Sequence, residues 1–349
     1  MDLERLRKYS VLNSFLLSPD FSEGSIREYL GDDTKFKVLN SVGDAFSLAL
    51  QFCNVAEGDF VLTQAIGAKM ALDSIIKLGA SPILIDSEAA NWNISAMMIE
   101  VAINQCVLTK GCRPKAIVVK HYMGVPAFMD EVVAVAKRHH IPLIEDCIGS
   151  MGASFNGKAC GTFGQYAIFS IRGSKMNKSG LGLLVHSVPR FDDLLQKLVE
   201  RDGLGYKGDL DGTFSLSEFR RELSLRKRVF DIYTSAFSDI EGVNFYKCLV
   251  PNVQPNHAYS PLVVQERLFP HKRDEVVQAI ADAGFEDCCA FPPSLHTVEP
   301  YKNLPFYGCM VGSDICTNGL ILPSNSSLSI SDIDKIVGAV FKTLGIKRK

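Results

Sequence analysis

Short apolar runs alternate with longer amphipathic stretches from about residue 37 to residue 185. The runs GDFVLTQ, SPILIDS, KAIVVKHY and IPLIEDC have the length and composition of strands, and a stretch with helical periodicity separates each from the next. Such connections favour a mostly parallel sheet with helices on both faces. Functional side chains are then expected at the edge where the strands end. Asp86, His121 and Asp146 fall at or near these ends and are predicted to face one crevice.

The pattern changes after Val185. Helical stretches flank a Gly/Asp-rich break and lead to a strand, HAYSPLVVQE, a helix, HKRDEVVQAIADAG, an apolar run, GLILPS, and a last helix, SISDIDKIVGAVFKTLG. A chain of 349 residues also exceeds the usual size of one compact domain. We therefore predict an N-terminal segment over residues 1–35, a large α/β domain over 36–235 and a small C-terminal α+β domain over 236–349.

Charge and hydropathy argue against several classes of function. The formal net charge of −2 gives no general attraction for nucleic acid or an anionic membrane. No window approaches the roughly 20 apolar residues of a membrane span, and the start MDLERLRKYS lacks the apolar core of a secretory signal. We expect a soluble cytoplasmic protein without nucleic-acid or membrane partners.

Ten cysteines are scattered through apolar runs, a distribution typical of reduced, buried thiols. No Cys-x-x-Cys pair occurs, and the adjacent Cys288 and Cys289 do not have the spacing of zinc ligands. We therefore predict no metal site.

The segment Ile141–Val185 carries the residues of one particular kind of cofactor site. Asp146 ends a strand, and Lys175 follows two more strand-like runs in a loop rich in serine and lysine. A carboxylate can keep a pyridine nitrogen protonated, and an amine can join an aldehyde, so these residues suit the two ends of pyridoxal 5′-phosphate. Gly43, at a helix start, and Ser170 offer donors for the phosphate.

The surroundings of these residues decide between this interpretation and a simpler one, because a lone aspartate after a strand is more often a cap and a lone loop lysine is more often solvated. They resemble the DegT/DnrJ/StrS family of pyridoxal phosphate-dependent sugar aminotransferases. The family's typical block is matched by Ile144-Glu145-Asp146, a series of glycines, Phe169-Ser170 and Ser174-Lys175. Three further segments are also similar to family segments: LGASPILID, KHYMGVPAFMDEVVAVAKRHHIPLIED and FPPSLHTVEPYKN. The resemblance therefore covers nearly the whole chain.

This resemblance implies a fold-type I aminotransferase architecture and a homodimer with sites at the subunit interface. Lys175 would carry the cofactor as a Schiff base and act as the catalytic proton carrier. Asp146 would bind the ring nitrogen, and Ser170 would help to hold the phosphate. The family's usual reaction passes an amino group, commonly from glutamate, to a keto carbon of a nucleotide-linked deoxysugar.

The chain departs from the family at several cofactor-binding positions. Ser41-Val42-Gly43 stands where the family usually has Ser-Gly-Thr at the phosphate-binding helix start. Ala68 aligns with an aromatic residue that stacks on the ring, and Gly149 with a side chain that approaches the ring hydroxyl. Thr213-Phe214-Ser215 aligns with an Asn-x-Arg segment that the partner subunit usually supplies, and Leu181 replaces the glutamate of a GEGG motif.

Two hypotheses follow from these similarities and departures. The first is an active enzyme that aminates a nucleotide-linked keto-sugar for cell-surface polysaccharide or natural-product synthesis. The second is a catalytically impaired homologue that acts as a scaffold or as the partner of a complete aminotransferase chain. Sugar dehydration is a third and weaker idea, because family members that catalyse it usually replace the lysine by histidine, whereas Lys175 is kept here.

Overall fold

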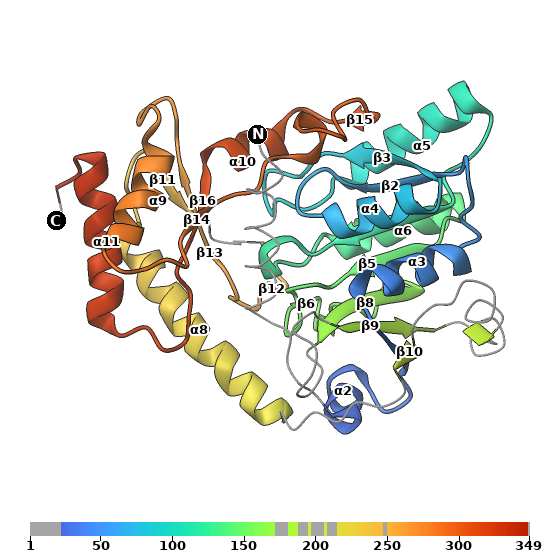
Figure 1. The fold of residues 1–349 in the computed structure, drawn as a ribbon, viewed down its shortest axis with the longest axis horizontal. Coiled ribbons are helices and arrows are strands. Elements are labelled where there is room, and N and C mark those ends of the chain that lie inside the picture. Colours follow the sequence, from blue (N-terminus) through green and yellow to red (C-terminus); the bar gives the residue numbers. More distant parts are fainter. Residues whose placement is uncertain are drawn as a thin grey trace.

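A nine-stranded sheet forms the centre of the larger part of the molecule (Figure 1). The computed structural model describes residues 22–171, 181–187, 195–196, 206–207, 215–246 and 250–347. Six parallel strands lie across the sheet in the order β15 (Phe306–Tyr307), β3 (Ser81–Ile85), β2 (Phe60–Gln64), β4 (Ala116–Lys120), β5 (Leu143–Asp146) and β8 (Tyr166–Ile171). Then follow β9 (Leu181–His186), β1 (Lys35–Leu39) and β10 (Tyr206–Lys207), each antiparallel to its neighbour.

Helices cover both faces of this sheet, as the alternating pattern predicts. One face packs against α3 (Val42–Phe52) and α4 (Lys69–Lys77). The other packs against α2 (Glu23–Leu30), α5 (Ala96–Lys110) and α6 (Met129–His139). The central strands read as continuous apolar runs because both of their faces are buried; all five residues of β4 are buried.

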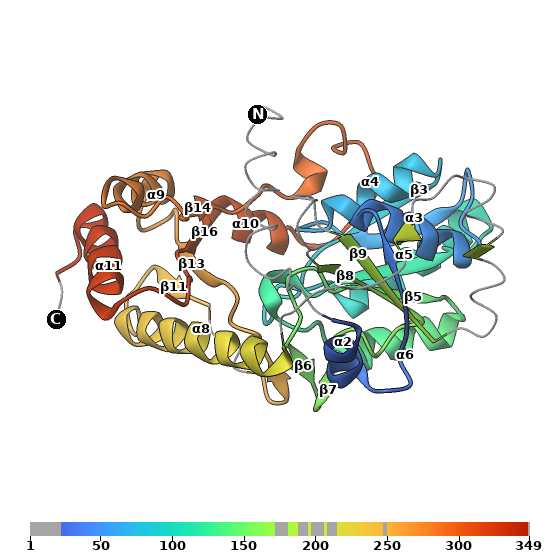
Figure 2. The same ribbon diagram turned by 60° about the horizontal axis from the view of Figure 1, so that its bottom comes forward.

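A four-stranded antiparallel sheet forms the centre of the smaller part, to the left in Figures 1 and 2. Its strands are β11 (Val243–Phe245), β13 (Ser260–Val264), β16 (Gly319–Leu322) and β14 (Cys289–Ala290). They share a core with α8 (Leu216–Ala236), α9 (Lys272–Asp282) and α11 (Ile330–Leu344). The mostly parallel α/β architecture with a smaller α+β part is therefore confirmed.

Two segments of the second half of the chain join the first half. The short strand β15 extends the large sheet beside β3. A further three-stranded sheet pairs β12 (Val253–Gln254) with β6 (Ser154–Phe155), which pairs with β7 (Lys158–Ala159). The boundary between residues 235 and 236 stays a prediction, and β15 shows that the chain crosses back over it.

The helix ends follow familiar capping chemistry. Ser215 caps α8 and Ser329 caps α11, each in a capping box with the acidic residue three positions later. None of the helices among the described residues is long and apolar enough to cross a membrane.

Candidate active site

Asp146 is the buried carboxylate at the carboxyl end of β5. Its side chain is 1% exposed. The amide of Ile148 donates to Asp146 Oδ1 at 3.1 Å, which is a local turn bond that fixes the carboxylate at the strand end. By strand alternation Asp146 shares a face with Ile144, which packs in the core under α3 and α4. The predicted anchor for a ring nitrogen therefore lies on the side of the sheet where α3 and α4 begin.

The amino end of α3 and Ser170 lie beside each other. Gly182 of β9 pairs with Ser170 of β8, and a Cβ on Gly182 would lie only 2.4 Å from the carbonyl oxygen of Ser41. This close approach requires glycine at residue 182 and places β8 and β9 against the start of α3. The structure thus brings together the predicted phosphate donors Gly43 and Ser170, with Ser41 beside them.

Ser41 is the N-cap of α3, and its Oγ accepts a hydrogen bond from the amide of Asp44 at 3.0 Å. A hydroxyl that accepts one bond still has its own proton to donate. The first-turn amides, including that of Gly43, have no partner within the helix, and the helix dipole favours an anion there. The aspartate at residue 44 thus supplies a capped amide at this end of the helix.

Ala68 is fully buried and is the N-cap of α4, without a side-chain capping bond. The aromatic ring of Tyr122 lies against the preceding residue: a Cβ on Gly67 would be 2.5 Å from Tyr122 Cδ2. The Tyr122 hydroxyl is buried and has no hydrogen-bond partner among the described residues. An unpaired buried hydroxyl costs on the order of 1 to 3 kcal/mol, so this donor favours a polar ligand atom.

Gly149 follows Asp146 in a tight turn, with φ of +80°. A Cβ at this position would lie 2.7 Å from the hydroxyl oxygen of Tyr259. Asn256 holds the same turn from the smaller part of the molecule, because its Nδ2 donates to the carbonyls of Gly149 and Met151, both at 2.9 Å. The space of the missing side chain is thus taken by Tyr259.

Tyr259 is a buried donor rather than an anion. Burial raises the pKa of Tyr259 to about 12, with Arg226 opposing the rise and Asp146 contributing to it. Arg226, on α8, is itself buried and bonds Glu222 Oε1 at 2.8 Å. Tyr259 was missed in the sequence because its nearness to Asp146 arises from packing between distant segments.

Lys120 is a second basic residue at this site, and the sequence interpretation had passed over it. It ends β4 and stands in register with Asp146 of β5. Its Nζ lies 3.2 Å from Asp146 Oδ1 and 3.4 Å from the carbonyl oxygen of Ile148. The signal in the sequence was a lysine at the end of the apolar run AIVV.

The prediction that Asp86 and His121 share one crevice with Asp146 is wrong. Asp86 accepts hydrogen bonds from the amides of Cys309, Val311 and Gly312 at 2.8 to 3.0 Å, and so anchors the start of α10 (Val311–Asn318). His121 bonds Glu145, which is adjacent to Asp146 in the strand and so points to the opposite face.

His121, Glu145 and Cys147 place potential metal-ligand atoms within 4.8 Å of one another. The ligand atoms of the first two already have protein partners. The amide of Ala127 donates to His121 Nδ1 at 3.2 Å, so Nε2 carries the proton and donates to Glu145 at 3.1 Å. Glu145 also accepts from three backbone amides, each at 2.7 Å. This cluster is a hydrogen-bonded structural anchor.

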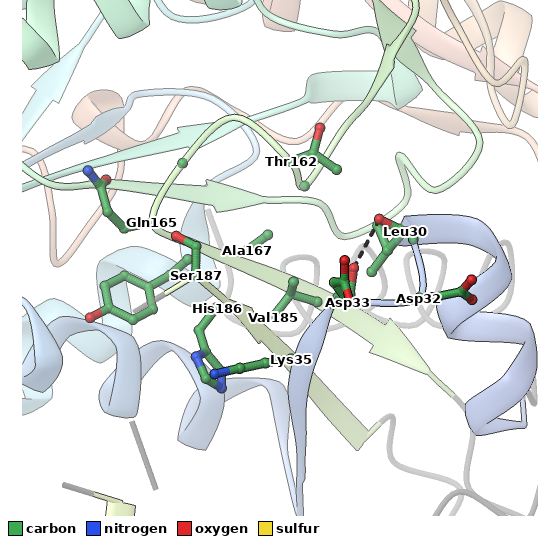
Figure 3. Close-up of a pocket in the computed structure, with 15 residues that line it drawn as sticks. Leu30, Asp32, Asp33, Lys35, Thr162, Gln165, Ala167, Val185, His186 and Ser187 are labelled. Carbon is green, nitrogen blue, oxygen red and sulfur yellow. Dashed lines mark hydrogen bonds between the residues drawn. The ribbon is translucent and has the colours of Figure 1, made fainter. Parts of the chain in front are cut away.

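A cavity of about 480 Å³ lies elsewhere, where β8 begins and β9 ends (Figure 3). Ala167 and Val185 line it, and both belong to the core under α5 and α6. Asp146 points to the other face of the sheet. The cavity is therefore separate from the Asp146 site.

Two parts of the predicted site lie outside the described residues. Lys175, with Ser174 before it, falls in residues 172–180. In the sequence Lys175 follows the last residue of β8 by four positions. Of the segment aligned with Asn-x-Arg, Ser215 alone is described, and it caps α8.

The donor set described above fits a ligand with a phosphate at one end and a ring nitrogen at the other. First-turn amides and hydroxyls suit the phosphate, and a buried carboxylate suits a protonated ring nitrogen. Fold and site together define a fold-type I aminotransferase of the pyridoxal phosphate-dependent class. The chain belongs to the DegT/DnrJ/EryC1/StrS aminotransferase family, whose model matches residues 19–198 and 209–341. The cofactor of this family is pyridoxal 5′-phosphate.

Individual relatives agree with this assignment. GDP-perosamine synthase of Caulobacter vibrioides is 26% identical over 327 residues, which cover 87% of this chain and 84% of the relative. A DegT/DnrJ/EryC1/StrS aminotransferase from Brucella abortus has a similar structure, with a TM-score of 0.80, 21% identity and 98% of each chain covered. The PLP form of a Streptococcus pneumoniae protein described as a sugar aminotransferase matches with a TM-score of 0.76 at 19% identity, covering 95% of this chain and 92% of the other.

Proposed function

We propose that this chain is a pyridoxal phosphate-dependent sugar aminotransferase that passes an amino group, from glutamate, to the keto carbon of a nucleotide-linked deoxysugar. Cell-surface polysaccharide and natural-product sugars are the products we expect. The observation that carries the proposal is the buried carboxylate of Asp146 on the same side of the sheet as the amino end of α3. The sugar specificity rests on the relatives alone.

Each end of the cofactor has its own set of groups in this proposal. Ser41, Gly43 and Ser170 hold the phosphate, and Asp146 holds the ring nitrogen. When bound, pyridoxal phosphate supplies an aldehyde that takes up the amino group and a ring that withdraws electrons. Lys175 joins the aldehyde and carries the proton during transfer.

The remaining groups orient the ring and keep water away. Ala68 lies at the buried start of α4, and the ring of Tyr122 packs against the preceding Gly67. The Tyr259 hydroxyl, beside Gly149, replaces the polar side chain that the family usually has there. We propose a homodimer in a cytoplasmic setting as the active form.

A transamination assay tests the proposal. Purified protein with pyridoxal phosphate, glutamate and a nucleotide-linked 4-keto-deoxysugar is expected to yield an aminosugar nucleotide, detected by mass spectrometry. Lys175→Ala is expected to abolish the product, because the proposal assigns the aldehyde of the cofactor and the proton transfer to this lysine. No product across a panel of nucleotide-linked keto-sugars, from protein that has bound the cofactor, contradicts the sugar-transfer step.

A second candidate function is a catalytically impaired partner or scaffold subunit. The ion pair between Lys120 and Asp146 favours it, because the carboxylate that the ring nitrogen needs already has a cationic partner. Co-purification with a complete aminotransferase chain, together with absence of cofactor binding by this chain, would support this candidate.

A further inference from the structure

Lys120 and Asp146 form a buried ion pair at the centre of the candidate site. Their side chains are 8% and 1% exposed, and Nζ lies 3.2 Å from Oδ1. The two residues stand in register on neighbouring parallel strands, so their side chains leave the same face of the sheet. The register of the two strands therefore fixes the relative positions of the two charged side chains.

The surroundings of Lys120 are shaped to hold its side chain. A Cβ on Gly67 would lie 3.2 Å from Lys120 Cδ, so the lysine stem runs beside a residue that has no side chain. The ammonium also donates to the carbonyl oxygen of Ile148 at 3.4 Å. Two of its three protons are thus directed to the last residue of β5 and to the turn that follows it.

This arrangement has a direct consequence for the cofactor, if the proposed function is correct. A protonated ring nitrogen would be a second cation at the Asp146 carboxylate. Like charges at one buried carboxylate repel each other, and the low local dielectric strengthens the repulsion. The ring nitrogen and the Lys120 ammonium therefore compete for one acceptor.

We propose that Lys120 is a positioning residue that neutralises Asp146 in the cofactor-free protein and competes with the ring nitrogen of pyridoxal phosphate. The inference rests on the proposed function, because it assigns the ring nitrogen to Asp146. It predicts that removal of the ammonium strengthens cofactor binding. A pair that serves stability alone would give weaker or unchanged binding when it is removed.

The first experiment compares equilibrium binding of pyridoxal phosphate to the wild-type chain, Lys120→Met and Lys120→Gln. Methionine keeps the stem, and glutamine also keeps a neutral donor for Asp146. Both variants are expected to bind at least about tenfold more tightly, which is the scale of one charge-assisted hydrogen bond. Lys227→Met is the matched control, because it removes a lysine from an exposed pair with Asp231, and its affinity is expected to be unchanged.

A second measurement needs no variant. The 1-deaza analogue of pyridoxal phosphate has the same phosphate and aldehyde but no ring nitrogen. In the wild-type chain the two compounds are expected to bind within about threefold of each other, because the nitrogen gains little at a carboxylate that is already paired. In Lys120→Met the natural cofactor should be preferred by at least about tenfold.

A third measurement uses the cofactor-free protein. Lys120→Met should lower its stability to urea, because the buried carboxylate loses its counter-ion, and the loss should shrink in an Asp146→Asn background. An equal loss in both backgrounds overturns the pairing.

The outcomes separate this inference from the proposed function. Unchanged or weaker binding by both Lys120 variants, or a strong wild-type preference for the natural cofactor over the deaza analogue, overturns the competition while the proposed function stands. No binding of either compound to any variant overturns both.

Discussion

The hydroxyl oxygen of Tyr259 lies 2.7 Å from the point where a side chain at Gly149 would begin. The turn that carries Gly149 has φ of +80°, a conformation that favours glycine, and Asn256 bonds its carbonyl. A residue from the smaller part of the molecule thus fills the space beside Asp146 that the first half of the chain leaves open. A side chain added at Gly149 would therefore clash with Tyr259 and destabilise the loop after β5.

Gly149→Ala should therefore lower the free energy of unfolding by about 2 to 4 kcal/mol, the sum of left-handed strain and overpacking against Tyr259. Gly157→Ala is the matched control, because Gly157 has φ of +74° but nothing lies within 4 Å of its Cβ position. It should cost only about 1 kcal/mol. Urea unfolding of both variants measures the difference, and equal losses would show that Tyr259 does not restrict the site.

Glu145→Gln should lower the free energy of unfolding by about 2 to 4 kcal/mol, although it changes one atom. Glu145 accepts three backbone amides and the His121 ring, and the amide of glutamine can serve as acceptor through only one of its two atoms. Glu275→Gln, at an exposed residue of α9, is the control and should change stability by less than about 0.5 kcal/mol. If Glu145→Gln lowers the free energy of unfolding by no more than Glu275→Gln does, Glu145 is not a structural anchor.

Metal removal should leave the stability of the folded protein unchanged. The nitrogen atoms of His121 and the oxygen atoms of Glu145 are occupied by protein hydrogen bonds, so a divalent ion would have to displace them. Melting curves recorded with a chelator and with added zinc should agree within about 2 °C. A large rise of the melting temperature with zinc would instead identify the cluster with Cys147 as a metal site.

The free energy of unfolding should fall at low pH because of one partly buried histidine, His257. Burial lowers the pKa of His257 to about 4, with nearby Lys227 adding to the effect and Asp231 opposing it. Between pH 6.5 and 4 the unfolded chain binds a proton that the folded chain does not, so this part of the stability is complete above pH 6.5 and is lost as the pH falls through the window.

The loss attributable to His257 should be on the order of 3 kcal/mol by pH 4. His257→Asn, which tolerates the observed φ of +53°, should flatten the pH dependence by that amount relative to the wild-type chain. Identical slopes for the two proteins would place the protonation of His257 outside the folding equilibrium. Urea unfolding at pH 4.5, 5.5 and 7 is sufficient for the comparison.

The central parallel strands could be predicted from the sequence because β2, β3, β4 and β5 are apolar runs buried on both faces, and a longer helical stretch separates each from the next. The sequence runs at β2, β3, β4 and β5 all became strands of the large sheet. The positions of β1 and β15 could not be predicted in this way. They join the sheet through pairings between distant segments, which leave no local period.

A site residue could be predicted from the sequence only where its residue type and its place at a strand end suggest its chemical role. Asp146 could be chosen because it is a carboxylate at a strand end, and the structure confirms its burial there. Lys120 was overlooked in favour of its neighbour His121, although strand alternation places Lys120 on the face of Asp146 and His121 on the other. Tyr259 reaches the site through tertiary packing, which the sequence pattern does not encode locally.

The visible absorption spectrum of the purified chain with pyridoxal phosphate, recorded before and after glutamate, tests the central claim most directly. A site built on Asp146 and Lys175 should give the visible absorbance of the lysine-bound cofactor, and glutamate should convert it to the amine form of the cofactor. Lys175→Ala should remove the absorbance. A wild-type spectrum that shows only free cofactor, and that is the same for Lys175→Ala, would contradict the assignment of this chain as an aminotransferase.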